Sequence, residues 1–358
     1  MDLDLLISEL VAGKTAALAR AISVVENMRP GFERLLGEIH RSLGRARRIG
    51  ITGPPGAGKS TLVERLVTQY RSAGLKVAVV AVDPTSPFTG GALLGDRIRM
   101  ESIALDKNVY IRSMASRGSL GGLATTTREV CDVLDAAGFD RILVETVGVG
   151  QSELDVARMA DSTVLVLVPE SGDGIQTLKS GVMEIADIFV VNKADRTGAD
   201  KLRQEIEVTL GIRRGNAFRK IPAHHGLRGV TLSEAKGRQP RRVPAPSGAA
   251  RPQGDSLWEQ PVVLTAAAKG EGIDQVFAAL DRHHEWLSSG GELDTRRRRR
   301  LLERTREVVD RATRKWVWEE TRAEQLIKER LDEVAGGDVS PYELAQDVLE
   351  ELKQGEKI

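Results

Sequence analysis

The stretch Gly53-Pro54-Pro55-Gly56-Ala57-Gly58-Lys59-Ser60 fits the phosphate-loop pattern G-x-x-x-x-G-K-[ST] at every fixed position. An apolar run at residues 48–52 precedes it and predicts a buried strand. After it, the apolar residues within 62–67 fall on one face of a predicted helix. Loop N–H groups and a helix N-terminus both attract phosphate. The succession of strand, glycine loop and helix therefore predicts a site for a nucleoside triphosphate.

Individual residues of this loop have distinct expected roles. The glycines let the backbone wrap closely around phosphate. Lys59 would reach the β- and γ-phosphates and neutralise charge during hydrolysis, and the Ser60 hydroxyl would ligate Mg²⁺. We predict that the whole loop and the next residue, Thr61, bind the nucleotide. The alternative is a glycine-rich turn with a chance lysine, and the flanking strand and helix weigh against it.

Composition narrows the class of protein. A chain of 358 residues can form one large domain with appendages, or two domains. Its 52 basic and 51 acidic residues give no global field that favours nucleic acid or an acidic membrane. The single cysteine, Cys131, excludes an internal disulfide and any Cys-x-x-Cys site. No apolar run reaches the roughly 18 residues of a membrane span, and the N-terminus lacks the basic start of a secretory signal. We expect a cytoplasmic protein that binds neither nucleic acid nor membrane.

From about residue 46, apolar runs alternate with helical segments. This alternation predicts an α/β fold with a mostly parallel sheet and helices on both faces. Together with the phosphate loop and the Asn-Lys-x-Asp motif at 192–195, it indicates a P-loop NTPase G domain. The expected strands are Ile49–Thr52, Lys76–Val82, Val109–Arg112, Arg141–Glu145, Thr163–Val168, Ile188–Asn192 and Pro261–Thr265. Ligands bind beyond the carboxyl ends of the strands in such sheets, so polar residues at these ends are the candidates for the site.

Three segments make up the expected domain organisation. Residues 1–45 form a helical N-terminal extension, and residues 46–290 form the P-loop domain. Within that domain, residues 213–257 are rich in Pro, Gly and Arg and form an insertion, for which a solvated loop is favoured over a partner-binding segment. Residues 291–358 form a C-terminal helical arm.

The arm opens with five consecutive arginines, Arg296–Arg300, and carries a long apolar stripe that ends at Gly336-Gly337. A last helix follows, and its start at residues 340–343 reads as a capping box. The stripe must pack against something. Its length favours the arm of a second copy over the chain's own main domain.

Two carboxylates at strand ends are candidates for the magnesium site. Asp83 ends the second predicted strand, where it can meet Mg²⁺ directly or through water. The glycine-rich segment at 86–100 is expected to be a mobile loop that closes on the γ-phosphate. Glu145 ends the fourth strand, with Gly148 three residues on, the layout that senses Mg²⁺ and the γ-phosphate in nucleotide switches.

Asn192-Lys193-Ala194-Asp195 at the end of the sixth strand indicates which base is bound. Asp195 can accept hydrogen bonds from guanine N1–H and the exocyclic amine, a donor pair that adenine lacks. Lys193 can lay its apolar stem along the ring, and Asn192 can tie loops together. The small residues Thr265-Ala266-Ala267 would let backbone N–H groups approach the guanine carbonyl. GTP and GDP are the predicted nucleotides.

Other conspicuous residues are given plainer interpretations. The pairs His224-His225 and His283-His284 lack accompanying ligands at metal-site spacing, so zinc or nickel binding there is disfavoured. Cys131 is expected to be a small buried hydrophobe. Trp316 and Trp318 are expected to be packing residues rather than a stacking platform.

Taken with the phosphate loop, Asp83-Pro84, Gly95-Asp96 and Asn192–Asp195, the stretch Glu145-Thr146-Val147-Gly148-Val149-Gly150-Gln151-Ser152-Glu153 resembles one family. It is the methylmalonyl-CoA mutase-associated GTPases, relatives of the human methylmalonic aciduria type A protein. Some members carry the older label of arginine/ornithine transport-system kinase. Met183-Glu184-Ile185-Ala186-Asp187 is also typical of the family. The resemblance covers nearly the whole chain.

The resemblance implies a G-protein chaperone for an adenosylcobalamin-dependent acyl-CoA mutase, which gates cofactor loading and removes damaged cofactor. It places Ser60, Asp83, Asp96 and Glu145 around Mg²⁺, and it implies that the C-terminal arm builds a homodimer. It also makes the loop matching Pro169–Lys179 a third switch that reports to the mutase.

We expect in-line hydrolysis in which Lys59 and Glu145 are the catalytic residues. Gln151 is the nearest candidate for a residue that orients the attacking water. Slow turnover, accelerated by the partner, is therefore expected. Two other functions stay open. A nickel-insertion GTPase would need a Cys/His metal site, against which the lone cysteine argues. A kinase of an amino-acid transport system would need an acceptor site with a positioned base.

Overall fold

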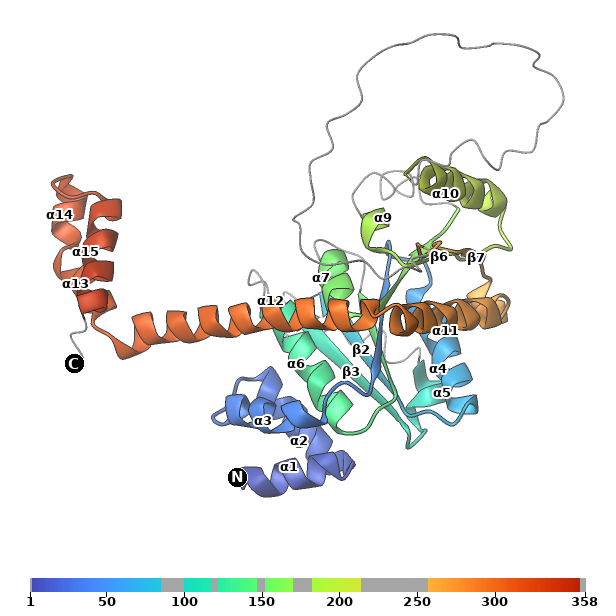
Figure 1. Cartoon of the computed structure of the whole chain (residues 1–358), viewed down its shortest axis with the longest axis horizontal. Helices are drawn as coiled ribbons and strands as arrows, with labels where there is room; N and C mark the ends of the chain where they lie inside the picture. The colour runs from blue at the N-terminus through green and yellow to red at the C-terminus, as the bar shows by residue number, and fades with distance from the viewer. Residues whose placement is uncertain are drawn as a thin grey trace, which may run out of the picture. The chain divides into compact units, whose positions relative to one another are not determined.

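The computed structural model describes residues 2–84, 100–116, 122–146, 152–169, 182–213 and 257–354. The chain divides into two compact units, Met1–Thr295 and Arg296–Ile358. Figure 1 follows the chain through the helices and strands of these units. Among the described residues, no helix combines the length and apolar character needed to cross a bilayer.

The described strands of the first unit form one parallel sheet with the order β3-β2-β4-β1-β5-β6-β7. The strands are β1 (Arg47–Thr52), β2 (Val77–Pro84), β3 (Val109–Ser116), β4 (Arg141–Thr146), β5 (Ser162–Leu167), β6 (Ile188–Val191) and β7 (Val262–Leu264). Each coincides with an expected strand, so the predicted parallel α/β fold is confirmed. Because β1 lies between β4 and β5, the phosphate loop that follows β1 begins at the centre of the carboxyl edge.

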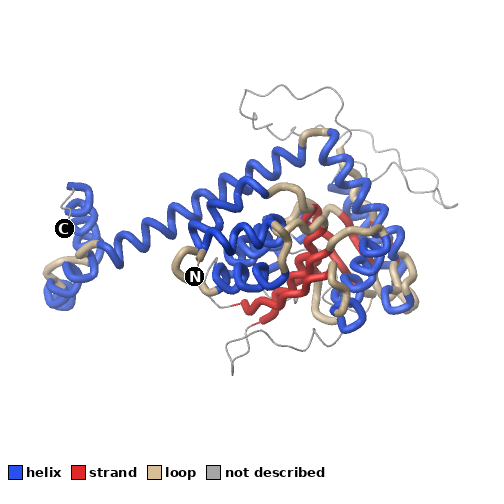
Figure 2. Tube along the Cα trace, turned by 90° about the horizontal axis from the view of Figure 1, so that it is seen from below, coloured by secondary structure: helices blue, strands red, loops and turns tan. Residues whose placement is uncertain are grey.

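Helices cover both faces of this sheet (Figure 2). One face packs against α4 (Lys59–Ser72), α5 (Glu101–Ala104) and α11 (Ile273–Ser289). The other packs against α6 (Gly122–Ala136), α7 (Ser152–Met159), α9 (Val182–Ile185) and α10 (Ala199–Arg213). Both faces are therefore buried, which explains the nearly continuous apolar runs. In β2, for example, Val77 and Val79 pack on the face covered by α4, whereas Ala78 and Val80 pack on the face covered by α6.

The N-terminal helices share a core with the sheet. These helices are α1 (Leu3–Val11), α2 (Thr15–Glu26), α3 (Phe32–Ile39) and the short 3₁₀ helix η1 (His40–Ser42). Their buried residues, such as Leu10 and Ile22, pack in one cluster with Val130 and Leu134 of α6. The helical extension is thus part of the first unit rather than an independent module.

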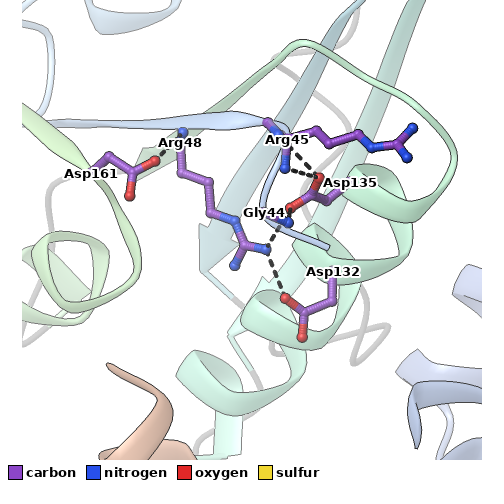
Figure 3. Close-up of polar contacts among 7 residues, drawn as sticks. Gly44, Arg45, Arg48, Asp132, Asp135 and Asp161 are labelled. Atoms are coloured by element: carbon purple, nitrogen blue, oxygen red, sulfur yellow. Dashed lines mark hydrogen bonds and ion pairs between the residues drawn. The ribbon is translucent and has the colours of Figure 1, made fainter. Parts of the chain in front are cut away.

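A buried polar network holds the chain where it leaves these helices and enters β1 (Figure 3). The carboxylate of Asp135 on α6 accepts hydrogen bonds from three consecutive backbone N–H groups, Gly44 at 2.9 Å, Arg45 at 3.2 Å and Ala46 at 3.0 Å. The Arg48 guanidinium donates from Nη2 to Asp132 Oδ1 at 2.7 Å. These carboxylates satisfy donors that would otherwise be buried unpaired, so they fix the start of the central strand.

Charge balance within this network keeps Arg48 ionised. Burial by itself would lower the pKa of the Arg48 guanidinium, but the adjacent Asp132 and Asp135 raise it above its ordinary value. The backbone N–H of Arg48 donates in addition to Asp161 at 3.0 Å. A buried cation with matched carboxylates is stable only as a complete set, so loss of one member leaves a charge uncompensated.

The second unit is helical, as expected for the arm, and its apolar stripe is divided among several helices. Its helices are α12 (Glu292–Lys315, which begins in the first unit), the π-helical turn η4 (Trp316–Glu320), α13 (Ala323–Glu329), α14 (Leu331–Gly336) and α15 (Pro341–Gln354). The chain breaks after η4 because Thr321 turns extended and its hydroxyl accepts from Ala323 N at 3.1 Å, which starts α13.

The predicted capping box is confirmed in this unit. Ser340 N donates to Glu343 Oε2 at 2.8 Å, and Glu343 N donates to Ser340 Oγ at 3.2 Å. A small core of Ala323, Leu344 and Val348 joins α13 to α15. Trp316 and Trp318, expected as packing residues, are nearly half exposed in the single chain, at 44% and 48%.

Candidate functional site

The phosphate loop joins β1 to α4, and two of its glycines are required by close contacts. Gly53 has φ of 140°, and a Cβ there would lie 2.0 Å from Val166 O of β5. Gly58 has φ of 85°, and a Cβ there would lie 2.3 Å from Asn192 Nδ2. Both positions therefore exclude any other residue without a shift of the loop or its neighbours. They let the loop lie directly against β5 and Asn192.

Lys59 starts α4 and is buried, with 5% of its surface exposed. Its Nζ donates to two carbonyls of the loop, Gly53 O at 2.8 Å and Pro54 O at 3.0 Å. The ammonium is thus held within the curve of the loop, beside the N-terminus of α4. A fixed cation beside a helix N-terminus favours an anionic ligand such as phosphate.

Ser60 and Glu145 come together at the start of α4. The Ser60 hydroxyl donates to Glu145 Oε1 at 2.6 Å, and Glu145 is 6% exposed. The sheet register sets this pairing, because Glu145 of β4 lies opposite Ile51 of β1. A hydroxyl and a carboxylate oxygen are the ligand types that Mg²⁺ takes in nucleotide sites, so these two residues fit the predicted ion.

The other two predicted magnesium ligands are not described at the level of side chains. Asp83 is the penultimate residue of β2, two strands from β1, and its side chain lies outside the described residues. Asp96 lies outside them entirely. Within the described ranges, no group of three or more His, Cys, Asp or Glu side chains could hold a metal ion. The described half of the predicted ligand set therefore consists of Ser60 and Glu145.

Asn192 joins three parts of the site. This buried side chain follows β6, and its Nδ2 donates to Ala57 O of the phosphate loop at 2.8 Å. Its Oδ1 accepts from Thr265 Oγ1 at 3.0 Å and from Ala267 N at 3.1 Å. The phosphate loop and the loop after β7 are therefore cross-linked through one amide, as the sequence led us to expect for Asn192.

Asp195 stands in the turn that follows Asn192. Lys193 has φ of 57°, a left-handed conformation that is uncommon for a residue with a side chain, and it starts this turn. Asp195 pairs with Lys269 Nζ at 3.0 Å, and this hydrogen bond is the main cause that lowers the pKa of the Asp195 carboxyl. Asp195 is thus ionised and accepts only, as the donor edge of guanine requires.

The loop after β7 uses its first three N–H groups internally. Thr265 N donates to Val191 O at 2.9 Å, Ala266 N to Glu271 O at 3.1 Å, and Ala267 N to Asn192 Oδ1 at 3.1 Å. The next amide, Ala268 N–H, has no hydrogen-bond partner in the part of the chain that the structure describes. Thr265, Ala266 and Ala267 thus shape the loop, and Ala268 is the residue whose N–H can be offered to a carbonyl oxygen.

Arg65 is a site residue that the sequence did not suggest. From α4 it donates through Nε to Ala267 O at 3.2 Å and through Nη2 to Ala268 O at 3.0 Å. The phosphate-binding helix and the loop after β7 are therefore linked a second time. Nothing in the sequence distinguishes this arginine from those on a solvated helix face, because its partners are backbone carbonyls about 200 residues away.

Several predicted elements lie outside the described residues. They are the glycine-rich loop at 86–99, Gln151, the third switch from Glu170 onward, the pair His224-His225 and residues 214–256 of the insertion. Pro169 is the described residue before the third switch, and Arg213 is the described residue before the insertion.

Cys131, which was expected to be a small buried hydrophobe, is buried, and so is His283, where metal binding was disfavoured. Cys131 is fully buried on α6. His283 of α11 is also fully buried, and its Nδ1 lies 2.8 Å from Ser162 Oγ while its Nε2 lies 3.3 Å from Asp187 Oδ1. Asp187 also accepts from Thr163 N at 2.8 Å, so it ties the starts of β5 and β6 together. These contacts lie within the core of the first unit.

The fold and the site together define a P-loop GTPase: a parallel sheet, a phosphate loop at its centre and an Asn-Lys-x-Asp turn cross-linked to that loop. The chain belongs to the MeaB family, since the family model described as "Methylmalonyl Co-A mutase-associated GTPase MeaB" matches residues 18–322. The predicted family membership and GTPase class are thereby confirmed.

Two bacterial relatives and one from the mouse agree with this assignment. A probable GTPase of Mycobacterium tuberculosis is 39% identical, over 94% of this chain and 91% of the relative. The GTPase ArgK of Escherichia coli is 35% identical, over 85% of this chain and 82% of ArgK. The mouse protein "Methylmalonic aciduria type A homolog, mitochondrial" is 34% identical, over 82% of this chain and 66% of that protein.

A solved structure is similar to this chain as well. It is a crystal structure described as "LAO/AO transport system kinase", with a TM-score of 0.64 and 28% sequence identity. The similarity covers 98% of this chain and 97% of the chain in that crystal structure.

Proposed function

We propose that this GTPase serves an adenosylcobalamin-dependent acyl-CoA mutase, gating the loading of the cofactor and protecting or reactivating the mutase. The observation that carries the proposal is the match of residues 18–322 to a family described as methylmalonyl-CoA mutase-associated. The name of the mouse relative, which refers to methylmalonic aciduria, supports it. The single cysteine of this chain, Cys131, is buried, which suits the reducing cytoplasm, where we place the protein.

In this proposal GTP and GDP bind across the carboxyl edge of the sheet. Lys59 and the loop Gly53–Ser60 hold the phosphates, and Asn192, Lys193 and Asp195 hold guanine. Ser60 and Glu145, with Asp83 and Asp96, would hold Mg²⁺, which neutralises phosphate charge when bound. The 2.6 Å contact of Ser60 with Glu145 supports this assignment, because both oxygens already lie at one point beside the phosphate loop.

Hydrolysis of the β–γ bond is then mostly a matter of positioning and electrostatic stabilisation. The Lys59 ammonium stabilises charge that builds on the phosphate oxygens. We expect slow turnover by the chain alone and faster turnover with the mutase, which would complete the arrangement around the attacking water.

We further propose that the protein is a homodimer through its C-terminal unit. Apolar side chains of this unit are exposed in the single chain, among them Leu302 at 54%, Val309 at 55% and Leu331 at 54%. An apolar stripe of this kind is typical of a surface that packs against another chain. Sedimentation of the full chain, compared with a chain that ends before Arg296, tests this proposal.

The mutase proposal is tested by purifying the chain with the acyl-CoA mutase of the same organism. We expect the mutase to raise the GTPase rate, and GTP to change the rate at which adenosylcobalamin enters the mutase. Lys59→Ala should abolish both effects, whereas Lys14→Ala, which removes a lysine from an exposed ion pair with Glu9, should keep both. If a purified, active mutase changes neither rate, the proposal is wrong and the GTPase serves another protein.

One observation favours a second candidate, a kinase: the similar crystal structure is described as a transport-system kinase. A kinase would move the γ-phosphate of GTP or ATP to a protein or an amino acid. Incubation with γ-labelled nucleotide and candidate acceptors separates the two functions, since a GTPase releases the label as inorganic phosphate and a kinase leaves it on the acceptor.

A further inference from the structure

Lys269 is a charged residue in contact with the carboxylate of the proposed base site. Its Nζ lies 3.0 Å from Oδ2 of Asp195. It belongs to the short 3₁₀ helix η3 (Ala267–Lys269), which follows β7. The partner carboxylate is the group that, in the proposed function, distinguishes guanine from other bases.

A carboxylate can serve both the lysine and a base. Each of its oxygens carries two lone pairs, so the pair of oxygens can accept about four hydrogen bonds. Guanine would use two of them, one from N1–H and one from the exocyclic amine. The Lys269 ammonium occupies one further position, on Oδ2. Such a contact restricts rotation of the carboxylate and leaves acceptor positions for the base.

The backbone that carries Lys269 is held firmly. Arg65 donates to the carbonyls of Ala267 and Ala268, at 3.2 and 3.0 Å. Lys269 N donates to Ala266 O at 2.8 Å. A lysine on a fixed loop can orient a partner, whereas a lysine on a free loop would lose the benefit to its own side-chain entropy.

The Asp195 turn is tied to the same loop. Ala194 N donates to Thr265 O at 2.9 Å, so the backbones on either side of the ion pair are hydrogen-bonded to each other. The distance between the two charged groups is therefore set by the fold. Both side chains remain partly accessible, Asp195 at 37% and Lys269 at 54%, so a base can reach the carboxylate.

We propose that Lys269 is a positioning residue for guanine recognition: it orients the Asp195 carboxylate so that both oxygens face the donor edge of the base. The inference rests on the proposed role of Asp195. It predicts that loss of Lys269 weakens guanine nucleotides more than hypoxanthine nucleotides. Guanine makes two hydrogen bonds to the carboxylate, whereas hypoxanthine lacks the exocyclic amine and makes one.

The test is calorimetric binding of GDP and inosine diphosphate to the full chain and four variants. Lys269→Gln removes the charge, and Lys269→Arg keeps it. Lys14→Gln is the matched control, because Lys14 makes an ion pair of 3.1 Å with 61% of its side chain exposed. Asp195→Ala tests the base site itself. Thermal unfolding of each variant checks that it is folded.

We expect Lys269→Gln to weaken GDP about two- to fivefold, the range of exposed ion pairs, and to weaken inosine diphosphate less. Lys269→Arg and Lys14→Gln should bind both nucleotides as the unmodified chain does. Unchanged or tighter GDP binding by Lys269→Gln, while Asp195→Ala loses the preference for GDP, would overturn the role of Lys269 alone. An Asp195→Ala variant that still prefers GDP would overturn the proposed base site, and the inference with it.

Discussion

Replacing Asn192 by alanine should damage folding and nucleotide binding together. The side chain is 3% exposed and is the only described link between Ala57 O in the phosphate loop and Ala267 N in the loop after β7. Removal of the amide leaves both backbone groups buried without this partner. Because the same amide holds the phosphate loop and the loop after β7, its removal should disturb both loops at once.

The size of the effect follows from the hydrogen bonds that are lost. Asn192 makes side-chain bonds to Ala57 O, Thr265 Oγ1 and Ala267 N, of 2.8, 3.0 and 3.1 Å. Each such bond contributes about 0.5–1.5 kcal/mol, and an unpaired buried partner adds a desolvation cost. Asn192→Ala should therefore lower the free energy of unfolding by about 2–4 kcal/mol.

Urea unfolding with and without GDP measures both consequences. At a GDP concentration of about 100 times Kd, the nucleotide should stabilise the unmodified chain by about 2.7 kcal/mol, and Asn192→Ala should show a smaller gain at the same concentration. The control is Asn27→Ala, whose exposed side chain donates only to Ser23 O and should cost less than about 1 kcal/mol. If Asn192→Ala unfolds within about 0.5 kcal/mol of the unmodified chain and gains as much from GDP, the cross-link has no energetic weight and the reasoning fails.

Three further predictions address the glycine loop, the buried network and the cysteine. Gly53→Ala should abolish nucleotide binding measured by fluorescent GDP, because its Cβ would lie 2.0 Å from Val166 O, whereas Gly37→Ala, with nothing within 4 Å, should bind normally. Asp135→Asn should lower the free energy of unfolding, measured in urea, by about 2–4 kcal/mol, because the carboxylate accepts from three backbone N–H groups. The control Asp4→Asn, at an exposed ion pair, should change it by less than about 1 kcal/mol. Equal effects of the two substitutions would refute the stabilising role of the network. Burial raises the pKa of the Cys131 thiol from 9.0 to about 12, so the unfolded thiol ionises first as pH rises, and the stability that this residue contributes is lost between these values. Cys131→Ala should therefore lose less stability than the unmodified chain between pH 9 and 11. The disulfide reagent dithiobis(nitrobenzoate) should label Cys131 only after the chain unfolds.

The strands and the phosphate loop could be predicted because their signals are local. The central strands contain short apolar runs, such as those at residues 77–82 and 164–167, that are buried on both faces. A run of this kind between two helical segments predicts a strand of a parallel sheet. The glycines of the loop are equally readable, because close approach of Gly53 to Val166 O admits no side chain. The capping box at Ser340 and Glu343 involves residues three apart and was predicted for the same reason.

The residues that sequence could not reveal make their contacts across the fold. Arg65 and Lys269 resemble any solvated basic residue until the sheet brings their partners within hydrogen-bonding distance. Asp135, on the inner face of α6, accepts from a segment about 90 residues earlier in the chain. The break at Thr321 depends on a hydroxyl that competes with the helix for backbone donors, and apolar spacing does not report such competition.

The account depends most on guanine recognition by Asp195, and a single binding measurement tests it. Xanthine has a carbonyl oxygen where guanine has its exocyclic amine, so an amide at position 195 can donate to xanthine where the carboxylate could only accept. Titration of GDP and xanthosine diphosphate into the full chain should show a strong preference for GDP. In Asp195→Asn that preference should reverse, with GDP weakened at least tenfold. If Asp195→Asn keeps the preference for GDP, guanine is not read at Asp195 and the base site lies elsewhere.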